Sequence, residues 1–370
     1  LKIKFVNLPY HAIGHLGIDP DVFIKEGILG DRPLFKAIWL IDRRKTKKNV
    51  SNLTMLYYWK EYIHIVSSTL LINFLYPLLN FKKINFDASK YSSITQKSAY
   101  APIVFKKWGN RNPLLTLTDK DIDYGMSKLN DYGITKDSWF VTIHCRESGY
   151  DKIQNPNKRW DEEKQHQNAD ITNYFNGIEE IVKRGGWCIR VGDSSMKPLP
   201  KLDNVIDYAN SEIKSDRMDV FLLASSKFHI GHSGVFSIAS SFGVPYAMVN
   251  QPLLGAVTLW GDIAIPKLFC DNKTNELIPF GEILSSDIGN YDYKYQFDKT
   301  GVSLIDNSDN EISDVVLEMF MRLENNVIYT DKDDELQYSF RSMLRPDHHG
   351  YYGNARIGKN FLNKYKHLIK

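Results

Sequence analysis

The chain has 370 residues, of which 43% are hydrophobic and 25% are charged, and its formal net charge is +3. This length and apolar content suit two domains of ordinary size, each with its own core. The small net charge argues against a nucleic-acid partner and leaves at most a mild preference for anionic ligands. Three isolated cysteines, Cys145, Cys188 and Cys270, argue against a disulfide framework and a close-spaced zinc site, and favour a reducing, cytoplasmic compartment.

The first residues form a strand-like segment without the pattern of a signal peptide, and the lack of an initiating Met suggests a piece of a longer protein. Residues 63–79 are the most apolar segment, but their polar interruptions predict a buried strand and helix rather than a membrane span. Aromatic and basic residues at 57–60 and 81–83, with a basic run at 43–48, leave open a peripheral contact with the inner face of the cell membrane. Such a basic run is also typical of a solvated loop.

The first third of the chain alternates strand and helix. Residues 2–8 read as a strand, residues 9–17 as a loop, residues 19–27 as a helix opened by Asp19 and Pro20, and residues 35–41 as a second buried strand. The alternation continues to residue 79. Residues 80–112 are polar and aromatic without a clear period, which predicts long loops, and a periodic helix then starts at Thr118 and ends at Gly133.

The second alternation is cleaner. Residues 139–144 form an almost wholly apolar strand of the kind buried in a parallel sheet, and it leads into Cys145, Arg146 and Glu147. A helix is predicted at 171–183, and the strand at 187–191 leads into Gly192, Asp193 and Ser194. Because ligands of open parallel sheets bind outside the carboxyl ends of the strands, we expect Arg146, Asp193 and Ser233 to face one crevice.

Residues 227–250 read as strand, small-residue turn, helix and strand. We expect the helix to open near Val235, with Ser233 as its cap, and to end at Gly243. A helix N-terminus behind a turn of small residues binds anions, and a diphosphate would suit it. The alternative is that the small residues only permit tight packing of helix on sheet.

After residue 250 prolines separate short apolar runs, and helices return at 311–324, 334–344 and 354–367. The two alternations therefore predict an N-terminal domain at 1–135 and a C-terminal domain at 136–353, with the last helix, about 354–370, packing back on the first domain. This pattern resembles the GT-B glycosyltransferases, which are α/β proteins with two facing Rossmann-like domains. The resemblance implies an active site in the cleft between an N-terminal acceptor domain and a C-terminal donor domain.

The segment from His144 to Tyr150 resembles the H-x-R motif of fucosyltransferase-like GT-B enzymes, in which the arginine binds the β-phosphate of a nucleotide sugar. Four blocks, residues 13–16, 144–150, 184–200 and 228–245, resemble a bacterial glycosyltransferase family of surface-polysaccharide loci. The resemblance implies transfer of a sugar from a nucleotide diphosphate sugar to a hydroxyl of a glycan, lipid-linked glycan or protein. Glu147 stands where the fucosyltransferase pattern has a second basic residue, so a GDP-fucose donor is not supported.

The resemblance and the residue chemistry together assign the donor side. A guanidinium grips phosphate oxygens through paired donors and offsets the charge of a leaving diphosphate, although an arginine at a strand end can also be purely structural. The expected diphosphate ligands are Arg146, His232, Ser233, Gly234 and Val235. The expected nucleoside or sugar ligands are His144, Tyr150, Gly192, Asp193 and Ser194.

The catalytic base is left open among His15, Glu147 and Asp19. His15 belongs to the expected acceptor side, where Gly14 would let backbone approach the ligand, but a hydrogen-bonded loop histidine is an equal reading. No cofactor or metal is expected, although Asp121, Asp123 and Asp292 keep a metal conceivable. Cys145 is rejected as a nucleophile because its neighbour His144 should point to the opposite face of the strand.

Two rival functions stay open at this point. A nucleotide-sugar epimerase or hydrolase on the same frame would bind the same diphosphate without an acceptor. A catalytically inert sugar-binding partner of a larger assembly would keep the fold without using the diphosphate.

Overall fold

The computed structural model describes residues 2–41, 50–75, 77, 84–91, 100–149, 160–346 and 348–369. The chain divides into two compact units. Unit 1 comprises Leu1–Gly125, Ser215–Ala224 and Gly234–Gly243, and unit 2 comprises Met126–Lys214, Ser225–Ser233 and Val244–Lys370. The chain therefore crosses between the units at five places, where a single cut at residue 135 had been predicted.

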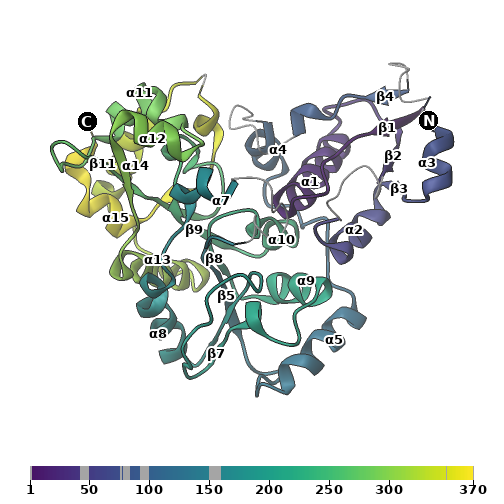
Figure 1. The fold of residues 1–370 in the computed structure, drawn as a ribbon, viewed down its shortest axis with the longest axis horizontal. Helices are drawn as coiled ribbons and strands as arrows, with labels where there is room; N and C mark the ends of the chain where they lie inside the picture. Colours follow the sequence, from purple (N-terminus) through teal and green to yellow (C-terminus); the bar gives the residue numbers. More distant parts are fainter. Residues whose placement is uncertain are drawn as a thin grey trace. The chain divides into compact units, whose positions relative to one another are not determined.

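Unit 1 contains a four-stranded parallel sheet in the order β3-β2-β1-β4 (Figure 1). Its strands are β1 (Ile3–Val6), β2 (Lys36–Leu40), β3 (His64–Val66) and β4 (Asn85–Phe86). The helices and 3-10 turns that accompany them are α1 (Ile13–Leu29), α2 (Leu53–Tyr58), η1 (Trp59–Glu61), α3 (Thr69–Leu75), η3 (Ser89–Tyr91), α4 (Tyr100–Trp108), α5 (Asp119–Asn130), α9 (Asp216–Ser225) and α10 (Phe236–Ser241). The helix α4 lies where a long loop had been predicted, and α5 runs across the unit boundary at Gly125.

Helix α1 begins six residues before the predicted start at Asp19, so Pro20 lies inside it. A proline removes the hydrogen bond to the carbonyl four residues earlier, here that of Leu16. The indole Nε1 of Trp59 donates to this Leu16 carbonyl at 2.7 Å. The orphaned acceptor is thus satisfied by a side chain 43 residues away, and the helix continues through the proline.

Helix α10 packs closely on α1, which explains why its segment belongs to unit 1. A Cβ on Gly234 would lie 2.8 Å from the Gly14 nitrogen, and one on Gly17 would meet Ser237 at 2.4 Å. The Ser237 hydroxyl donates to the Ile13 carbonyl at 2.9 Å, and that of Ser241 donates to Gly17 at 3.2 Å. Gly14 therefore serves helix packing in this structure, where the sequence had suggested close approach to a ligand.

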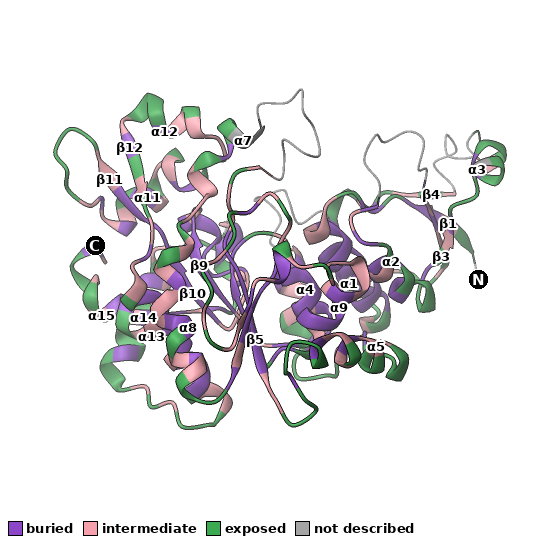
Figure 2. Ribbon diagram, turned by 60° about the horizontal axis from the view of Figure 1, so that its bottom comes forward, coloured by how far each residue is buried: buried purple, intermediate pink, exposed green. Residues whose placement is uncertain are grey.

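Unit 2 is built on a seven-stranded sheet in the order β13-β10-β9-β8-β5-β6-β7, with every neighbouring pair parallel. Its strands are β5 (Phe140–His144), β6 (Trp187–Arg190), β7 (Val205–Ile206), β8 (His229–Gly231), β9 (Tyr246–Gln251), β10 (Ile263–Pro266) and β13 (Arg356–Ile357). Every residue of β5 is buried, as its apolar run predicted, and the strand lies in the buried centre of this sheet (Figure 2).

Helices and turns surround this sheet in chain order. They are α7 (Trp160–Glu163), η4 (Gln165–Gln167), η5 (Ile171–Tyr174), α8 (Phe175–Lys183), η6 (Tyr208–Asn210), η7 (Leu254–Ala256), α11 (Phe280–Ser285), η8 (Asp287–Asn290), α12 (Lys294–Thr300), α13 (Asp309–Leu323), α14 (Asp331–Ser342), η9 (His349–Tyr352), α15 (Lys359–Lys364) and η10 (Lys366–Leu368). An antiparallel pair, β11 (Leu268–Asp271) and β12 (Val302–Ile305), precedes α13. A parallel sheet in each unit confirms the predicted α/β class.

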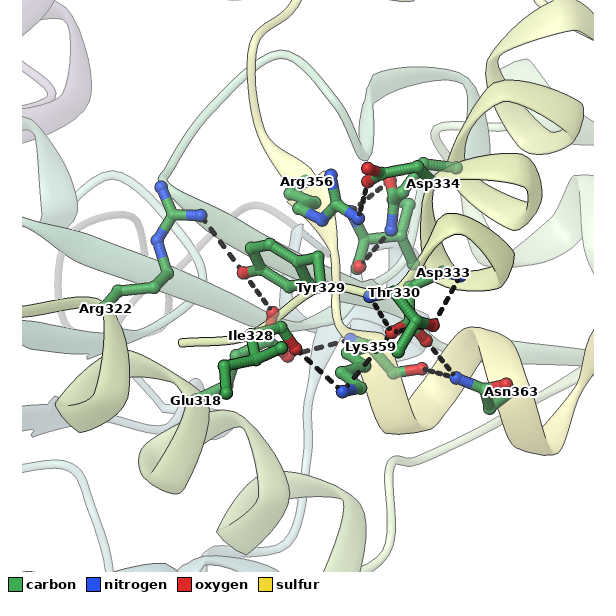
Figure 3. Close-up of polar contacts among 12 residues, drawn as sticks. Glu318, Arg322, Ile328, Tyr329, Thr330, Asp333, Asp334, Arg356, Lys359 and Asn363 are labelled. Carbon is green, nitrogen blue, oxygen red and sulfur yellow. Dashed lines mark hydrogen bonds and ion pairs between the residues drawn. The ribbon is translucent and has the colours of Figure 1, made fainter. Parts of the chain in front are cut away.

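The C-terminal helices are fastened to unit 2 by a polar network (Figure 3). Asp333 caps α14 with Thr330 and accepts a hydrogen bond from Asn363 of α15 at 2.7 Å. Glu318 of α13 accepts from the Lys359 backbone at 2.8 Å, at the start of α15. The expectation that the last helix packs back on the N-terminal domain is therefore wrong.

None of the helices in the part of the chain that the structure describes has the length and apolar content to cross a membrane.

Candidate functional site

The register of two central strands brings the two main sequence motifs to one edge of the unit 2 sheet. His144 at the end of β5 pairs with Gly231 at the end of β8. Arg146 and Ser233 therefore each stand two residues beyond a matched pair, at the carboxyl edge of the sheet. Asp193 stands three residues after Arg190, which pairs with Ile143, so it follows the same edge on β6. This edge is where open parallel sheets bind ligands.

The two loops at this edge are held against each other. The His144 Nδ1–H donates to the His232 carbonyl at 2.9 Å. A side chain on Gly231 would lie 2.4 Å from the His144 carbonyl oxygen, so only glycine fits there. Burial lowers the pKa of His144 to about 4, which keeps the ring neutral. His144 therefore shapes the site from beneath, and the predicted role as a nucleoside ligand is not needed to explain it.

Ser233 does not cap α10, contrary to the prediction. The helix begins at Phe236 with Val235 as its N-cap, and no side chain caps it. Ser233 is exposed and has a φ of 78°, a left-handed conformation that costs energy for a residue with a side chain. Because α10 has only six residues, a helix dipole contributes little here, and the strained turn itself is the feature to explain.

Arg146 is half-buried and held by backbone and amide acceptors. Its Nη1 donates to the Asn168 Oδ1 at 2.5 Å and to the Lys164 carbonyl at 3.2 Å. The Ala169 backbone N–H donates in turn to the Arg146 carbonyl at 3.0 Å. The loop that follows η4 thus fixes the guanidinium over the sheet edge.

Two lysines that the sequence reading missed join Arg146. Lys267 is only 2% exposed, and its Nζ contacts the Asp306 Oδ1 at 2.7 Å and the Asn168 carbonyl. Lys164 is 8% exposed and contacts the Asp292 Oδ1 at 2.5 Å. Lys267 directly follows β10, so the strand-end argument would have found it had residues 263–266 been predicted as a strand of this sheet.

A cavity of about 240 Å³ lies beside these cations within unit 2. Its lining includes polar and apolar side chains: His166, Asn168, Lys267, Phe297, Ser303 and Asp306. The rings of His166 and Phe297 lie 5.0 Å apart, which gives one wall an aromatic character. A small polar or anionic group fits this volume and lining.

Glu147 is engaged in an ion pair, which contradicts its prediction as a base. One carboxylate oxygen contacts the Arg190 Nη2, and the other accepts from the Lys197 backbone at 2.9 Å. Arg190 is fully buried. Because both oxygens of Glu147 serve the fold, the residue is structural, and the second position of the H-x-R block compensates an internal charge.

The predicted nucleoside ligands after β6 form a turn. The Asp193 Oδ1 accepts from the Ser195 backbone at 2.9 Å, which is the capping alternative that the sequence had left open. A side chain on Gly192 would lie 2.3 Å from the Met196 sulfur. Ser194 is exposed on the same turn, and Tyr150 lies outside the described residues.

Cys145 is a buried, inert thiol. Burial raises the pKa of Cys145 far above its ordinary value, and its Sγ donates to the Ala169 carbonyl at 3.3 Å. A thiol held protonated is a poor nucleophile, so the structure gives a second reason to reject Cys145 as one.

In unit 1, His15 and Asp19 form a pair on α1, so His15 does not lie in a loop as predicted. The His15 Nδ1 lies 2.7 Å from the Asp19 Oδ2, one helical turn away. The two residues are 3% and 0% exposed. A carboxylate that fixes the Nδ1–H tautomer leaves Nε2 as the basic nitrogen, which is the arrangement of an oriented general base.

The acidic residues that kept a metal conceivable are committed elsewhere. Asp121 contacts the Arg217 Nε at 2.6 Å and accepts from the Tyr58 hydroxyl, and Asp292 is paired with Lys164. Over the described ranges no group of three or more His, Cys, Asp or Glu side chains is placed to hold a metal ion.

The sequence matches no protein-family model and no curated protein. Among solved structures, the chain is similar to the iron-containing dodecameric glycosyltransferase TibC from enterotoxigenic E. coli, at 11% identity and a TM-score of 0.45 over 89% of this chain and 78% of that one. A glycosyl transferase of family 9 from Veillonella parvula shows 12% identity and a TM-score of 0.40 over 68% and 81% of the two chains. The ADP-heptose heptosyltransferase II of E. coli shows 12% identity and a TM-score of 0.37 over 68% and 85%. These likenesses are distant, and the α/β fold stands on the strand order and register of the chain itself.

Proposed function

We propose that this protein is a glycosyltransferase that moves a sugar from a nucleotide diphosphate sugar to a hydroxyl of a glycan, a lipid-linked glycan or a protein, in bacterial surface glycan synthesis. The observation that carries the proposal is the meeting of Arg146 with the strained Ser233 turn at the carboxyl edge of the unit 2 sheet. A backbone outlier at such an edge is a reason to look for a ligand there.

On the donor side, the leaving group is a nucleoside diphosphate whose negative charge grows as the glycosidic bond breaks. Arg146 supplies paired donors to phosphate oxygens, and Lys164 and Lys267 add positive charge beside it. Fixed cations in a partly buried site stabilise such charge without reorganisation. We therefore propose that transfer needs no metal ion, which activity in the presence of EDTA would test.

On the acceptor side, the attacking hydroxyl must lose a proton. His15, oriented by Asp19, is the base we propose, with Asp19 as its positioning residue. Glu147 is no longer a candidate because its carboxylate is bound to Arg190 and to the Lys197 backbone.

The first experiment is a thermal-shift screen of the purified chain against GDP, UDP, CMP, dTDP and ADP. A ligand at about 100 times its dissociation constant stabilises the folded state by about 2.7 kcal/mol, which gives a clear rise in melting temperature. We expect one nucleotide to stabilise the protein and Arg146→Ala to weaken that binding by roughly tenfold or more, the worth of a charged hydrogen bond. The matched control is Arg184→Ala, because Arg184 is an exposed arginine paired only with Glu180 on α8.

The same nucleotide's sugars then separate the rival functions. Turnover that requires an acceptor supports transfer, whereas hydrolysis or epimerisation of the donor alone supports the rival enzyme. In the transfer assay we expect His15→Ala to lower kcat by about a hundredfold to ten-thousandfold with donor binding unchanged. If no nucleotide binds, the proposed function is wrong and an inert binding partner becomes the better hypothesis.

A further inference from the structure

Three cations and two histidines converge beside the cavity of unit 2. Arg146, Lys164 and Lys267 reach it from three different segments, after β5, after α7 and after β10. His166 lines the cavity, and His232 follows β8 at the sheet edge. The nearby cations and burial together lower the pKa of His166 to about 3, with burial as the larger cause.

The two histidine rings carry nitrogen atoms whose hydrogen-bonding capacity is unused. His232 is 2% exposed; its Nε2–H donates to the Gln167 carbonyl at 2.5 Å, and its Nδ1 is buried without a hydrogen-bond partner among the described residues. Neither ring nitrogen of His166 makes a hydrogen bond of ordinary geometry within the part of the chain that the structure describes. Buried polar atoms normally find a partner, so three unused nitrogens beside one cavity indicate a missing ligand.

The rest of the lining indicates the charge of that ligand. Lys267 and Lys294 lie on the cavity wall, and each is matched by one carboxylate, Asp306 and Asp298. Arg146 adds a further positive charge through Asn168, which also lines the cavity. The hydrogen bonds given above for Arg146 go to an amide oxygen and a carbonyl rather than to a carboxylate, so an anion is the complementary guest.

We propose that this cavity binds a phosphate or diphosphate group and that binding is accompanied by protonation of His166. The inference rests on the proposed function for the source of the anion, the diphosphate of the donor. It adds Lys267 and His166 as binding residues, and it makes the site sensitive to pH.

The physical reason is a balance of charges around His166. The charged and titratable groups that face it come from every element packed around the cavity: Glu163 and Lys164 beside it, Arg146, His232, Lys267, Asp292, Asp306, and Lys294 and Asp298 of α12. While the cavity is empty of anions, the nearby cations oppose a further positive charge on the ring. A bound phosphate reverses that field, so the ring takes a proton from solvent and donates a hydrogen bond to a phosphate oxygen.

The expected consequence is that the anion binds more tightly as the pH falls. A group whose pKa rises on binding takes up protons, and by linkage acidification must then favour the bound state. The effect should be largest between the pKa of the free ring and that of the bound ring. Nucleotide binding that depended on Arg146 alone would lack this slope, because a guanidinium stays charged throughout.

The experiment is titration calorimetry of inorganic pyrophosphate into the whole protein, in two buffers with different ionisation enthalpies, at pH 6 and pH 7.5. The difference in heat between the buffers gives the protons taken up per ligand. We expect a fractional uptake that is larger at pH 6, that falls in His166→Asn, and a weaker affinity in Lys267→Met. The control is His367→Asn, an exposed histidine after α15.

The protonation of pyrophosphate itself is the same for every variant, so the difference between wild type and His166→Asn belongs to the protein. Equal proton uptake in these two proteins would overturn the inference while leaving the proposed function standing, provided that pyrophosphate binds. Binding unaffected by Lys267→Met would remove Lys267 from the site. If neither pyrophosphate nor any nucleotide binds, the inference and the proposed function fail together.

Discussion

Glu147 and Arg190 form an ion pair in which one partner is wholly removed from water. Arg190 is 0% exposed, and its guanidinium also reaches the Lys197 carbonyl at 2.6 Å and the Asp207 Oδ1 at 3.4 Å. Desolvating a guanidinium is costly, and nearby carboxylates offset that cost only while they stay in place. The sequence alone presents Glu147 as a polar residue next to Arg146, because its partner lies 43 residues further along the chain.

We therefore expect Glu147→Ala to lower the free energy of unfolding by about 3 kcal/mol, since the substitution strands a buried charge. Glu147→Gln, which keeps a hydrogen-bond acceptor for the Lys197 backbone, should cost less. Urea denaturation of the two variants measures both effects. A variant with wild-type stability but lost turnover would instead return Glu147 to the chemistry.

At the scale of an element, α1 shows how a tertiary contact overrides a local signal. Asp19 and Pro20 are a strong start signal for a helix, yet the helix begins at Ile13. The Trp59 indole makes this possible by bonding the Leu16 carbonyl that the proline leaves free. This contact can be tested because the two residues can be changed separately.

We expect Trp59→Phe to destabilise the protein by about 1–3 kcal/mol beyond its packing loss, because a buried carbonyl then lacks a partner. In a Pro20→Ala background the new backbone N–H can bond Leu16 itself, so the same Trp59→Phe substitution should cost less. A double-mutant cycle in urea measures the coupling. Additive effects of the two substitutions would show that the indole bond does not support the helix.

Local pattern predicted the elements whose burial follows from their own sequence. The apolar run of β5, the amphipathic α8 and the Ser308–Glu311 capping box of α13 all belong to this group. Other features depend on partners distant in sequence: the start of α1 on Trp59, the packing of Gly14 on Gly234 and the burial of Lys267 against Asp306. Of the site, the common edge of Arg146 and Ser233 followed from the strand-end rule, whereas the side-chain pairings required coordinates.

At the scale of the whole molecule, acid sensitivity is concentrated in unit 2. Three of its histidines, His144, His229 and His232, are at most 5% exposed. Burial lowers the pKa of His144 to about 4 and of His229 to about 3, and it lowers the pKa of His232 well below its ordinary value. Below pH 6.5 the unfolded chain therefore binds protons that the folded chain does not.

Stability should fall as the pH drops through 6.5, by about 2 kcal/mol for each of these histidines between pH 7 and pH 5. Ordinary carboxylates titrate below this window, so they contribute little to the loss. Urea midpoints at the two pH values measure it, with hydrogen exchange to localise the change to unit 2. A midpoint that does not move would show that these rings are protonated in the folded protein.

Charge is distributed unequally between the two units, which bears on the predicted membrane contact. Unit 1 holds 20 of the Lys and Arg residues and 12 of the Asp and Glu residues, a net charge of +8, so unit 2 carries −5 of the total of +3. Tyr58 and Trp59, which the sequence had offered as interfacial aromatics, are buried at 4% and 0%. The exposed apolar side chains of unit 1 lie instead on α3, where Leu70 is 83% and Phe74 is 77% exposed.

A basic unit with an exposed apolar helix should bind a bilayer that contains anionic lipid. We expect sedimentation with phosphatidylglycerol-containing vesicles but not with phosphatidylcholine alone, and weaker binding as salt screens the charges. Leu70→Ser or Phe74→Ser should each remove up to about 2 kcal/mol of apolar transfer, roughly thirtyfold in partitioning. Tyr338→Ser is the matched control, because Tyr338 is 76% exposed on α14 of the acidic unit. If the control weakens binding as much as the α3 variants, or if binding ignores lipid charge, the contact does not reside on unit 1.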